Sequence, residues 1–172
     1  EMKHKYLFAF VRNPWDRMVS LYHFIQTLKF NERKGWVTLP WILTYLYKYP
    51  RMFNNIYTHF YYIKLTKKYE NFTDFVKDIH NNLEWCMLKP QFDYLYSKED
   101  KLLVNYVGKF ENIQKELDKV TDVININREI LPKVNSTEHV HYSKYYNEET
   151  KEIISKIYRK DIEKFNYQFE EY

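Results

Sequence analysis

Two continuous apolar runs stand out against a background of mixed apolar and polar positions. Residues 6–11 (YLFAFV) predict a strand that is buried on both faces of a parallel sheet. Residues 103–107 (LVNYV) predict a second strand, which ends at Gly108. Two strands are too few for a free-standing sheet, so we expect the parallel sheet to be incomplete in this chain.

Elsewhere the apolar residues recur at helical spacing. A helix is predicted to begin at residues 13–16 (NPWD), which supply an N-cap residue, a proline for the first helical position and an acid for the first turn. The other expected elements are two helices within 38–66, helices over 72–81, after Asn112 as cap and after Asn147, and an extended loop over 125–146. The fold class predicted is a helix-rich α/β protein in which residues 1–172 form a single domain.

Composition narrows the function classes. The 172 residues are 45% hydrophobic and 20% aromatic, which excludes a disordered chain. The net charge of +4 is interspersed along the chain, so it is compatible with an anionic ligand but weaker than the basic stripe of a nucleic-acid-binding protein. The lone Cys86 excludes an internal disulfide, and the histidines form no ligand-spaced cluster, so no metal site is expected.

The longest uncharged runs are shorter than a membrane span of about 20 apolar residues, and they contain polar groups. We therefore expect no span in this chain and a cytoplasmic location by default. A Golgi or membrane-anchored location is the expectation if a preceding segment carries an anchor. The chain opens almost directly on the first predicted strand, so we expect upstream sequence to be missing.

A candidate phosphate site lies where the first strand meets the first helix. Arg12 follows the strand at the sheet edge where open parallel sheets bind ligands, and its planar guanidinium suits phosphate oxygens. Ser20 offers a hydroxyl about two turns into the helix, and Arg17 shares its face. The alternative is a structural Arg12 that pairs with Asp16.

Three blocks of the sequence, in order, resemble the carbohydrate-type and bacterial sulfotransferases, which take sulfate from 3′-phosphoadenosine 5′-phosphosulfate (PAPS). Residues 11–24 (VRNPWDRMVSLYHF) are similar to the family's 3′-phosphate-binding motif. Residues 106–117 (YVGKFENIQKEL) resemble a strand-to-helix segment of the family. The tail resembles the family from Leu131 to Tyr167, so the likeness covers most of the chain.

The resemblance implies a P-loop-NTPase-like sulfotransferase fold and metal-free transfer of a sulfuryl group from PAPS to a hydroxyl or amine of a carbohydrate or similar acceptor. It implies that Arg12 and Ser20 bind the 3′-phosphate of PAPS or of the product PAP, and Arg17 is taken with them as cofactor-binding. Glu111 matches an architectural motif, so we expect it to pack or to cap a helix rather than act as a catalytic acid. Asp161 is expected to be structural, and Asn166 is expected to adopt a left-handed conformation.

The chain departs from the family pattern at the donor loop. Relatives hold the 5′-phosphosulfate in a glycine-containing strand-to-helix loop, whereas neither Gly35 nor Gly108 lies in such a turn. No catalytic base is assigned, because the upstream His4 has no feature that marks it as one. A non-catalytic remnant that serves as a nucleotide-binding or assembly module is therefore the leading alternative. A nucleotide kinase and a nucleic-acid-binding module are further alternatives.

Two regions concern the ligands less directly. Residues near the expected nucleotide site in the loop before the last helix are not expected to contact the ligand; they are Lys133, Thr137 and His141. The aromatic residues of the central region are expected to pack in the core, with an acceptor-binding groove as the alternative; they are Trp36, Trp41 and the tyrosine cluster at 57–62.

Overall fold

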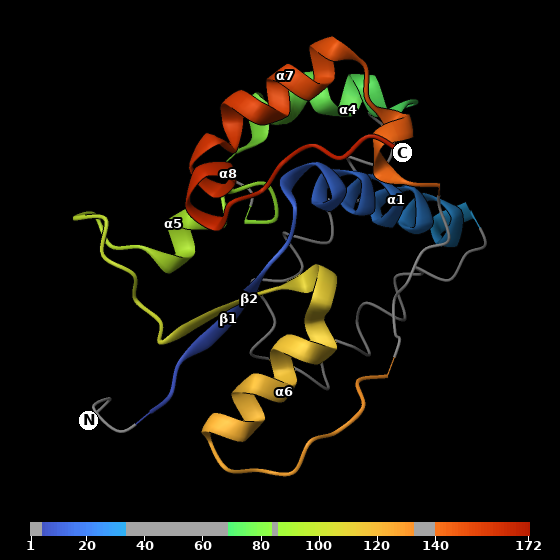
Figure 1. The fold of residues 1–172 in the computed structure, drawn as a ribbon. Helices are drawn as coiled ribbons and strands as arrows, with labels where there is room; N and C mark the ends of the chain where they lie inside the picture. The colour runs from blue at the N-terminus through green and yellow to red at the C-terminus, as the bar shows by residue number, and fades with distance from the viewer. Residues whose placement is uncertain (1–4, 34–68, 84–85, 133–139) are drawn as a thin grey trace, which may run out of the picture.

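The computed structural model describes residues 5–33, 69–83, 86–132 and 140–172 (Figure 1). Within these ranges the chain is helix-rich with a small parallel sheet, which gives it an α/β character. Its strands and helices are β1 (Phe8–Val11), α1 (Pro14–Arg33), α4 (Phe72–Asp78), α5 (Phe92–Leu95), β2 (Tyr106–Lys109), α6 (Ile113–Val123), α7 (Glu148–Ile157) and α8 (Arg159–Phe165). Short 3₁₀ turns cover Ile79–Asn82, Phe110–Asn112 and Tyr142–Tyr145.

The two strands run parallel, in a register that pairs Phe8 with Tyr106 and Val11 with Lys109. β2 begins later than the predicted strand at 103–107, and Gly108 lies inside it rather than after it. The shift has a local cause, because the Leu103 N–H donates to the carbonyl oxygen of Leu95 at 2.8 Å. Because of that hydrogen bond, the start of the predicted strand pairs with Leu95 instead of β1.

β1 is not buried on both faces, so that part of the prediction was wrong. Phe8 is 40% exposed, and only Val11 at the end of the strand is buried. In the described part of the chain β1 pairs only with β2. The sheet is thus incomplete among these residues, as its two predicted strands suggested.

Gly108 allows α6 to approach the sheet closely. A Cβ atom at this position would lie 2.8 Å from Glu116 Cβ and 2.9 Å from the ring of Phe10. Figure 1 shows α6 below the two strands, with α4, α7 and α8 above them. The close approach explains why a glycine occupies the interior of a strand, where it would otherwise be unfavourable.

The hydrophobic core lies on the other side of the sheet, where α1 packs against α4 and α7. Aliphatic and aromatic side chains from these helices and from the C-terminal tail fill it, including Met18, Ile25, Phe75, Val76, Ile154, Tyr158 and Tyr167. Because α1 leaves the end of β1 and enters this core, the turn between them is fixed at both ends.

The helix ends agree in part with the predictions. Asn13 caps α1, since its Oδ1 atom accepts the Trp15 N–H at 3.0 Å, and Asn147 caps α7 in a capping box with Thr150. Asn112 precedes α6, but its side chain makes no capping hydrogen bond because a 3₁₀ turn leads into the helix. The predicted last helix is divided at Tyr158 into α7 and α8.

α8 ends at Phe165, and the φ of 52° at its C-cap residue Asn166 confirms the predicted left-handed conformation. The loop predicted over 125–146 contains the 3₁₀ turn Tyr142–Tyr145.

Several predictions lie outside the described residues: those on His4, Gly35, Trp36, Trp41, the helices within 38–66 with the tyrosines at 57–62, Lys133 and Thr137. None of the described helices is long and apolar enough to cross a membrane.

Candidate functional site

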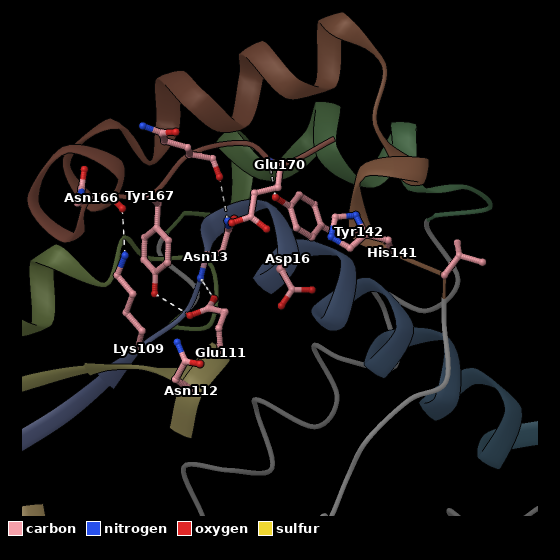
Figure 2. A pocket seen from close by; sticks show the side chains of 12 residues that line it. Asn13, Asp16, Lys109, Glu111, Asn112, His141, Tyr142, Asn166, Tyr167 and Glu170 are labelled. Carbon is pink, nitrogen blue, oxygen red and sulfur yellow. Dashed lines mark hydrogen bonds between the residues drawn. The ribbon is translucent and has the colours of Figure 1, made fainter. Parts of the chain in front are cut away.

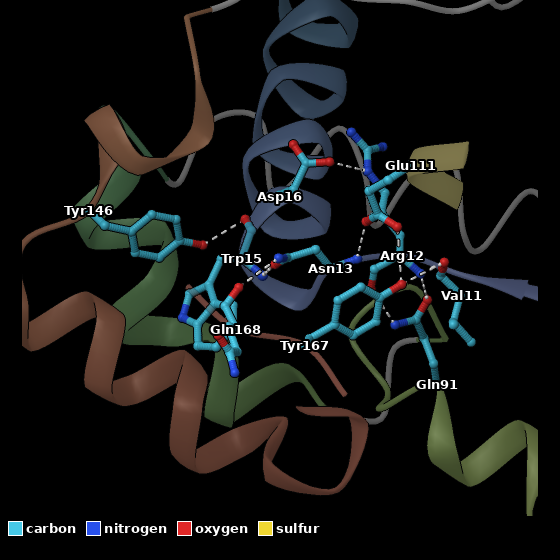
Figure 3. A network of polar contacts seen from close by, with 10 residues as sticks. All are labelled: Val11, Arg12, Asn13, Trp15, Asp16, Gln91, Glu111, Tyr146, Tyr167 and Gln168. Carbon is cyan, nitrogen blue, oxygen red and sulfur yellow. Dashed lines mark hydrogen bonds and ion pairs between the residues drawn. The ribbon is translucent and has the colours of Figure 1, made fainter. Parts of the chain in front are cut away.

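The turn that joins β1 to α1 is held by side chains from distant parts of the chain (Figure 3). Gln91 uses both ends of its side-chain amide on Arg12: its Oε1 atom accepts the Arg12 N–H at 2.9 Å, and its Nε2 atom donates to the Arg12 carbonyl oxygen at 2.8 Å. Gln91 precedes α5 and is 79 positions from Arg12 in sequence. One side chain therefore satisfies both backbone polar groups of the residue that leaves the sheet.

The neighbouring backbone groups of the turn are held in the same manner. Glu111 Oε1 accepts the N–H of Asn13 at 2.6 Å, and the hydroxyl of Tyr167 donates to the carbonyl oxygen of Val11 at 2.9 Å. The same hydroxyl lies 3.2 Å from Glu111 Oε2. Glu111 thus caps the start of α1 from the end of β2, which agrees with the structural role expected for it. Burial, followed by the Glu111 carboxylate, raises the pKa of the Tyr167 phenol.

Gln91 is itself fixed by Asp161, which is fully buried in the first turn of α8. The Asp161 carboxylate accepts the N–H groups of Gln91 and Phe92 at 2.8 and 2.7 Å, and the side-chain amide of Gln91 lies 3.3 Å away. Burial raises the pKa of Asp161, while the hydrogen bonds from the two backbone amides oppose that shift. The carboxylate therefore has the structural role expected of it.

The side chain of Arg12 forms an ion pair with the first turn of α1. Its Nε atom lies 2.6 Å from Asp16 Oδ2, and its guanidinium carbon lies 4.8 Å from the ring centroid of Phe110. The Arg12 side chain is 24% exposed. Its two terminal nitrogens make no hydrogen bond to any residue that the structure describes. The pairing with Asp16 posed as an alternative is thus present, and it leaves the outer edge of the guanidinium available.

Ser20 lies one turn beyond Asp16, on the same edge of α1. It is half-buried, and its hydroxyl has no hydrogen-bond partner within the described ranges. Arg12, Asp16 and Ser20 therefore follow one edge of the helix from its start. The assignment of Arg12 and Ser20 to a phosphate stays a prediction, and the geometry is compatible with it.

Arg17 is directed elsewhere. Its two terminal nitrogens donate to the carbonyl oxygens of Met87 and Lys89 at 2.7 and 3.0 Å, and its guanidinium lies 5.9 Å from the ring centroid of Tyr158. These contacts hold the segment before α5, which carries Gln91, against α1. The Arg17 guanidinium is therefore engaged with backbone carbonyl groups, and its assignment to the cofactor stays a prediction.

A cleft of about 620 Å³ opens beside this turn at the carboxyl ends of both strands (Figure 2). Among the described residues that line it are three carboxylates, from Asp16, Glu111 and Glu170, and one ammonium, from Lys109. The Lys109 ammonium donates to the carbonyl oxygen of Asn166 at 3.0 Å. The described lining residues are therefore acidic on balance, and by themselves they do not favour a phosphate.

His141 also lines this cleft, although it was not expected to contact a ligand. Its Nδ1 atom lies 2.9 Å from Ser143 Oγ, and its ring stacks on Tyr172 at 5.1 Å between centroids. Among the described residues, no group of three histidine, cysteine or carboxylate side chains is arranged to bind a metal ion.

Sequence reasoning did not find Gln91. Its sequence neighbourhood (KPQF) carries no signal beyond a proline before a short helix, and its role depends on a contact across 79 positions. Tyr167 belongs to the tail that resembles the family, but its bond to the end of β1 was not predicted. Both residues act on the turn through hydrogen bonds between distant segments, which local periodicity does not encode.

Comparison with known proteins identifies the family of this chain. The model of the sulfotransferase family matches residues 1–168, nearly the whole chain and including every residue that holds the β1–α1 turn. Searches of curated proteins and of solved structures found no match. Because the family model covers far more than half of the sequence, the chain belongs to the sulfotransferase family.

Proposed function

We propose that Arg12 and Ser20 bind the 3′-phosphate of PAPS, within an enzyme that transfers a sulfuryl group to a hydroxyl or amine of a carbohydrate or similar acceptor. One observation carries the proposal. The Arg12 guanidinium is held at the carboxyl end of a parallel strand, with terminal nitrogens that make no hydrogen bond in the described part of the chain. An arginine left with free donors at this edge of a sheet is suited to a phosphate.

The donor set fits a phosphate in kind and in number. Two terminal nitrogens of a guanidinium can bond two phosphate oxygens at once, and a serine hydroxyl can donate to a third. The start of α1 adds a favourable dipole. The carboxylates of Asp16 and Glu111 reduce the positive potential nearby. A phosphate here must therefore depend on direct hydrogen bonds to Arg12 rather than on diffuse positive charge.

The 5′-phosphosulfate has no equivalent assignment. Gly108 lies inside β2, where it admits α6, so it forms no phosphate-binding turn. We assign neither the groups that hold the phosphosulfate nor the catalytic base. The P-loop-like sulfotransferase fold is part of the proposal, and it is supported by a parallel strand that leads directly into a capped helix at the ligand-binding edge.

When bound, PAPS supplies the sulfuryl group, and the residues of this chain select and orient the nucleotide. Arg12 would distinguish PAPS from nucleotides that lack a 3′-phosphate, because its terminal nitrogens have no other hydrogen-bond partner among the described residues. Asp16 and the ring of Phe110 restrict the guanidinium from two sides, so little rotational freedom is lost on binding. Orientation of this kind, together with electrostatic stabilisation, is what a protein contributes to in-line group transfer.

The alternative is a sulfotransferase-like module that binds the nucleotide without catalysing transfer. The sequence supports it, because neither glycine lies in a glycine-rich strand-to-helix turn. An assay of PAP release from PAPS, with neutral sugars, amino sugars and phenols as acceptors, distinguishes the two. Acceptor-dependent release that Arg12→Ala abolishes supports the enzyme. Binding of PAP with no release for any acceptor supports the module, and PAP release unaffected by Arg12→Ala contradicts the site.

A further inference from the structure

We propose that Gln91, anchored by Asp161, is a positioning residue that sets Arg12 for recognition of the 3′-phosphate. The inference rests on the proposed function and adds residues from a different part of the chain to that site. It starts from the double hydrogen bond between the Gln91 amide and the backbone of Arg12, at 2.9 and 2.8 Å. A pair of bonds from one planar group fixes both the position and the tilt of the peptide that it holds.

Arg12 needs such support because it belongs neither to the strand nor to the helix. β1 ends at Val11 and α1 begins at Pro14, so among the described residues no ladder or helical hydrogen bond holds the Arg12 peptide. A partly buried peptide without partners is costly, and a tilted one would displace the guanidinium. The amide of Gln91 supplies both missing partners.

Gln91 is in turn held more firmly than an exposed glutamine would be. The buried carboxylate of Asp161 accepts the Gln91 backbone N–H at 2.8 Å and lies 3.3 Å from its Nε2 atom, which fixes the amide with its NH₂ toward the Arg12 carbonyl. Arg17 holds the preceding segment through Met87 and Lys89. The chain of contacts runs from α8 through the segment before α5 to Arg12.

The structure offers a matched control for the pair of hydrogen bonds between the Gln91 amide and the Arg12 backbone. Gln114 in α6 bonds the backbone of a different loop in the same way: its Nε2 atom donates to the Glu129 carbonyl oxygen at 3.0 Å, and its Oε1 atom accepts the Leu131 N–H at 2.8 Å. Replacing Gln114 therefore removes the same number and kind of hydrogen bonds without touching Arg12.

The experiment measures, by isothermal titration calorimetry, the affinity for adenosine 3′,5′-bisphosphate divided by the affinity for adenosine 5′-monophosphate. This ratio isolates recognition of the 3′-phosphate, and a general loss of stability does not move it. We expect Gln91→Met, which keeps the side-chain length, to lower the ratio by about tenfold, since one misplaced charged hydrogen bond changes affinity by about that factor. Gln91→Glu keeps the acceptor but sets a second oxygen against the Asp161 carboxylate and the Arg12 carbonyl, so it should also lower the ratio, whereas Gln114→Met keeps the wild-type ratio.

A second comparison tests the anchor. Asp161→Asn lowers the ratio in the wild-type background and lowers it no further in the Gln91→Met background if Asp161 acts through Gln91. Equal lowering in both backgrounds contradicts that route.

The wild-type protein separates failure of this inference from failure of the proposed function. Equal wild-type affinities for the two nucleotides overturn both. A high wild-type ratio that Arg12→Ala removes and Gln91→Met leaves intact overturns the positioning role alone. If Gln91→Met does not fold, a wild-type affinity ratio in Gln91→Glu likewise overturns the positioning role of Gln91.

Discussion

Asp16 lies in the first turn of α1 and accepts the Nε–H of Arg12 at 2.6 Å, so that the ion pair occupies only the inner edge of the guanidinium. A pair through a terminal nitrogen would have occupied one of the donors that a phosphate can use. The same contact directs the side chain along the edge of α1 that carries Ser20. The ion pair and a phosphate site are therefore compatible at one arginine.

Ser20→Ala tests whether this edge of α1 contacts the ligand. The hydroxyl of Ser20 makes no hydrogen bond to the described residues, so its removal should change the free energy of unfolding by less than about 0.5 kcal/mol. Affinity for adenosine 3′,5′-bisphosphate should fall by about fivefold to tenfold, as for one hydrogen bond to a charged group. Calorimetric titration and chemical denaturation measure the two quantities. Ser155→Ala in α7 is the control, and an unchanged Ser20→Ala affinity contradicts contact.

Glu111 provides a second test, because its carboxylate faces a cleft and resembles a catalytic acid. In our account it caps Asn13 through a backbone hydrogen bond. Glu111→Gln keeps an acceptor oxygen, so nucleotide affinity should stay within about threefold of wild type. Glu111→Ala leaves the Asn13 N–H without its partner and should lower the free energy of unfolding by about 1–3 kcal/mol.

The pH profile of sulfuryl transfer distinguishes the two roles of Glu111. We expect Glu111→Gln to retain the wild-type profile in the PAP-release assay. The loss of one limb of that profile, with affinity unchanged, would instead identify Glu111 as an acid or base in the reaction.

How far the sequence alone anticipated this site depends on the range of the interactions. The strand, the cap at Asn13 and the pairing of Arg12 with Asp16 all follow from residues within a few positions of one another. The contacts of Gln91 and Tyr167 join segments far apart in sequence, and no local pattern signals them. The start of β2 was misplaced for the same reason, since Leu103 pairs with Leu95 instead of continuing the strand.

Tyr158 gives a prediction about alkaline stability. Its side chain is fully buried and its hydroxyl donates to the Leu88 carbonyl oxygen at 2.7 Å. Burial raises the pKa of this phenol above the ordinary value of 10.0. The unfolded chain therefore loses this proton near pH 10 while the folded chain keeps it. The stability contributed by Tyr158 is complete below that pH and falls as the pH rises above it.

Tyr158→Phe removes the ionisable group and should make the decline of unfolding free energy above pH 10 shallower by about 1.4 kcal/mol per pH unit, the value for one proton. At pH 7 the variant should be less stable by about 1–3 kcal/mol, because the Leu88 carbonyl loses its donor. Urea denaturation from pH 7 to pH 11 measures both effects. Parallel wild-type and variant curves above pH 10 would contradict the assignment.

The most direct test of the central claim is thermal unfolding with adenosine 3′,5′-bisphosphate, with AMP and ADP as controls, on wild type, Arg12→Ala and Arg128→Ala. Arg128 pairs with Asp122 and makes a matched control, because it is an aspartate-bound arginine in a different loop. Ligand at about 100 times its Kd adds about 2.7 kcal/mol of stability, which raises Tm by roughly 5–10 °C. We predict this rise for the bisphosphate alone, lost in Arg12→Ala and kept in Arg128→Ala. No rise, or equal rises with all three nucleotides, would contradict a 3′-phosphate site at Arg12.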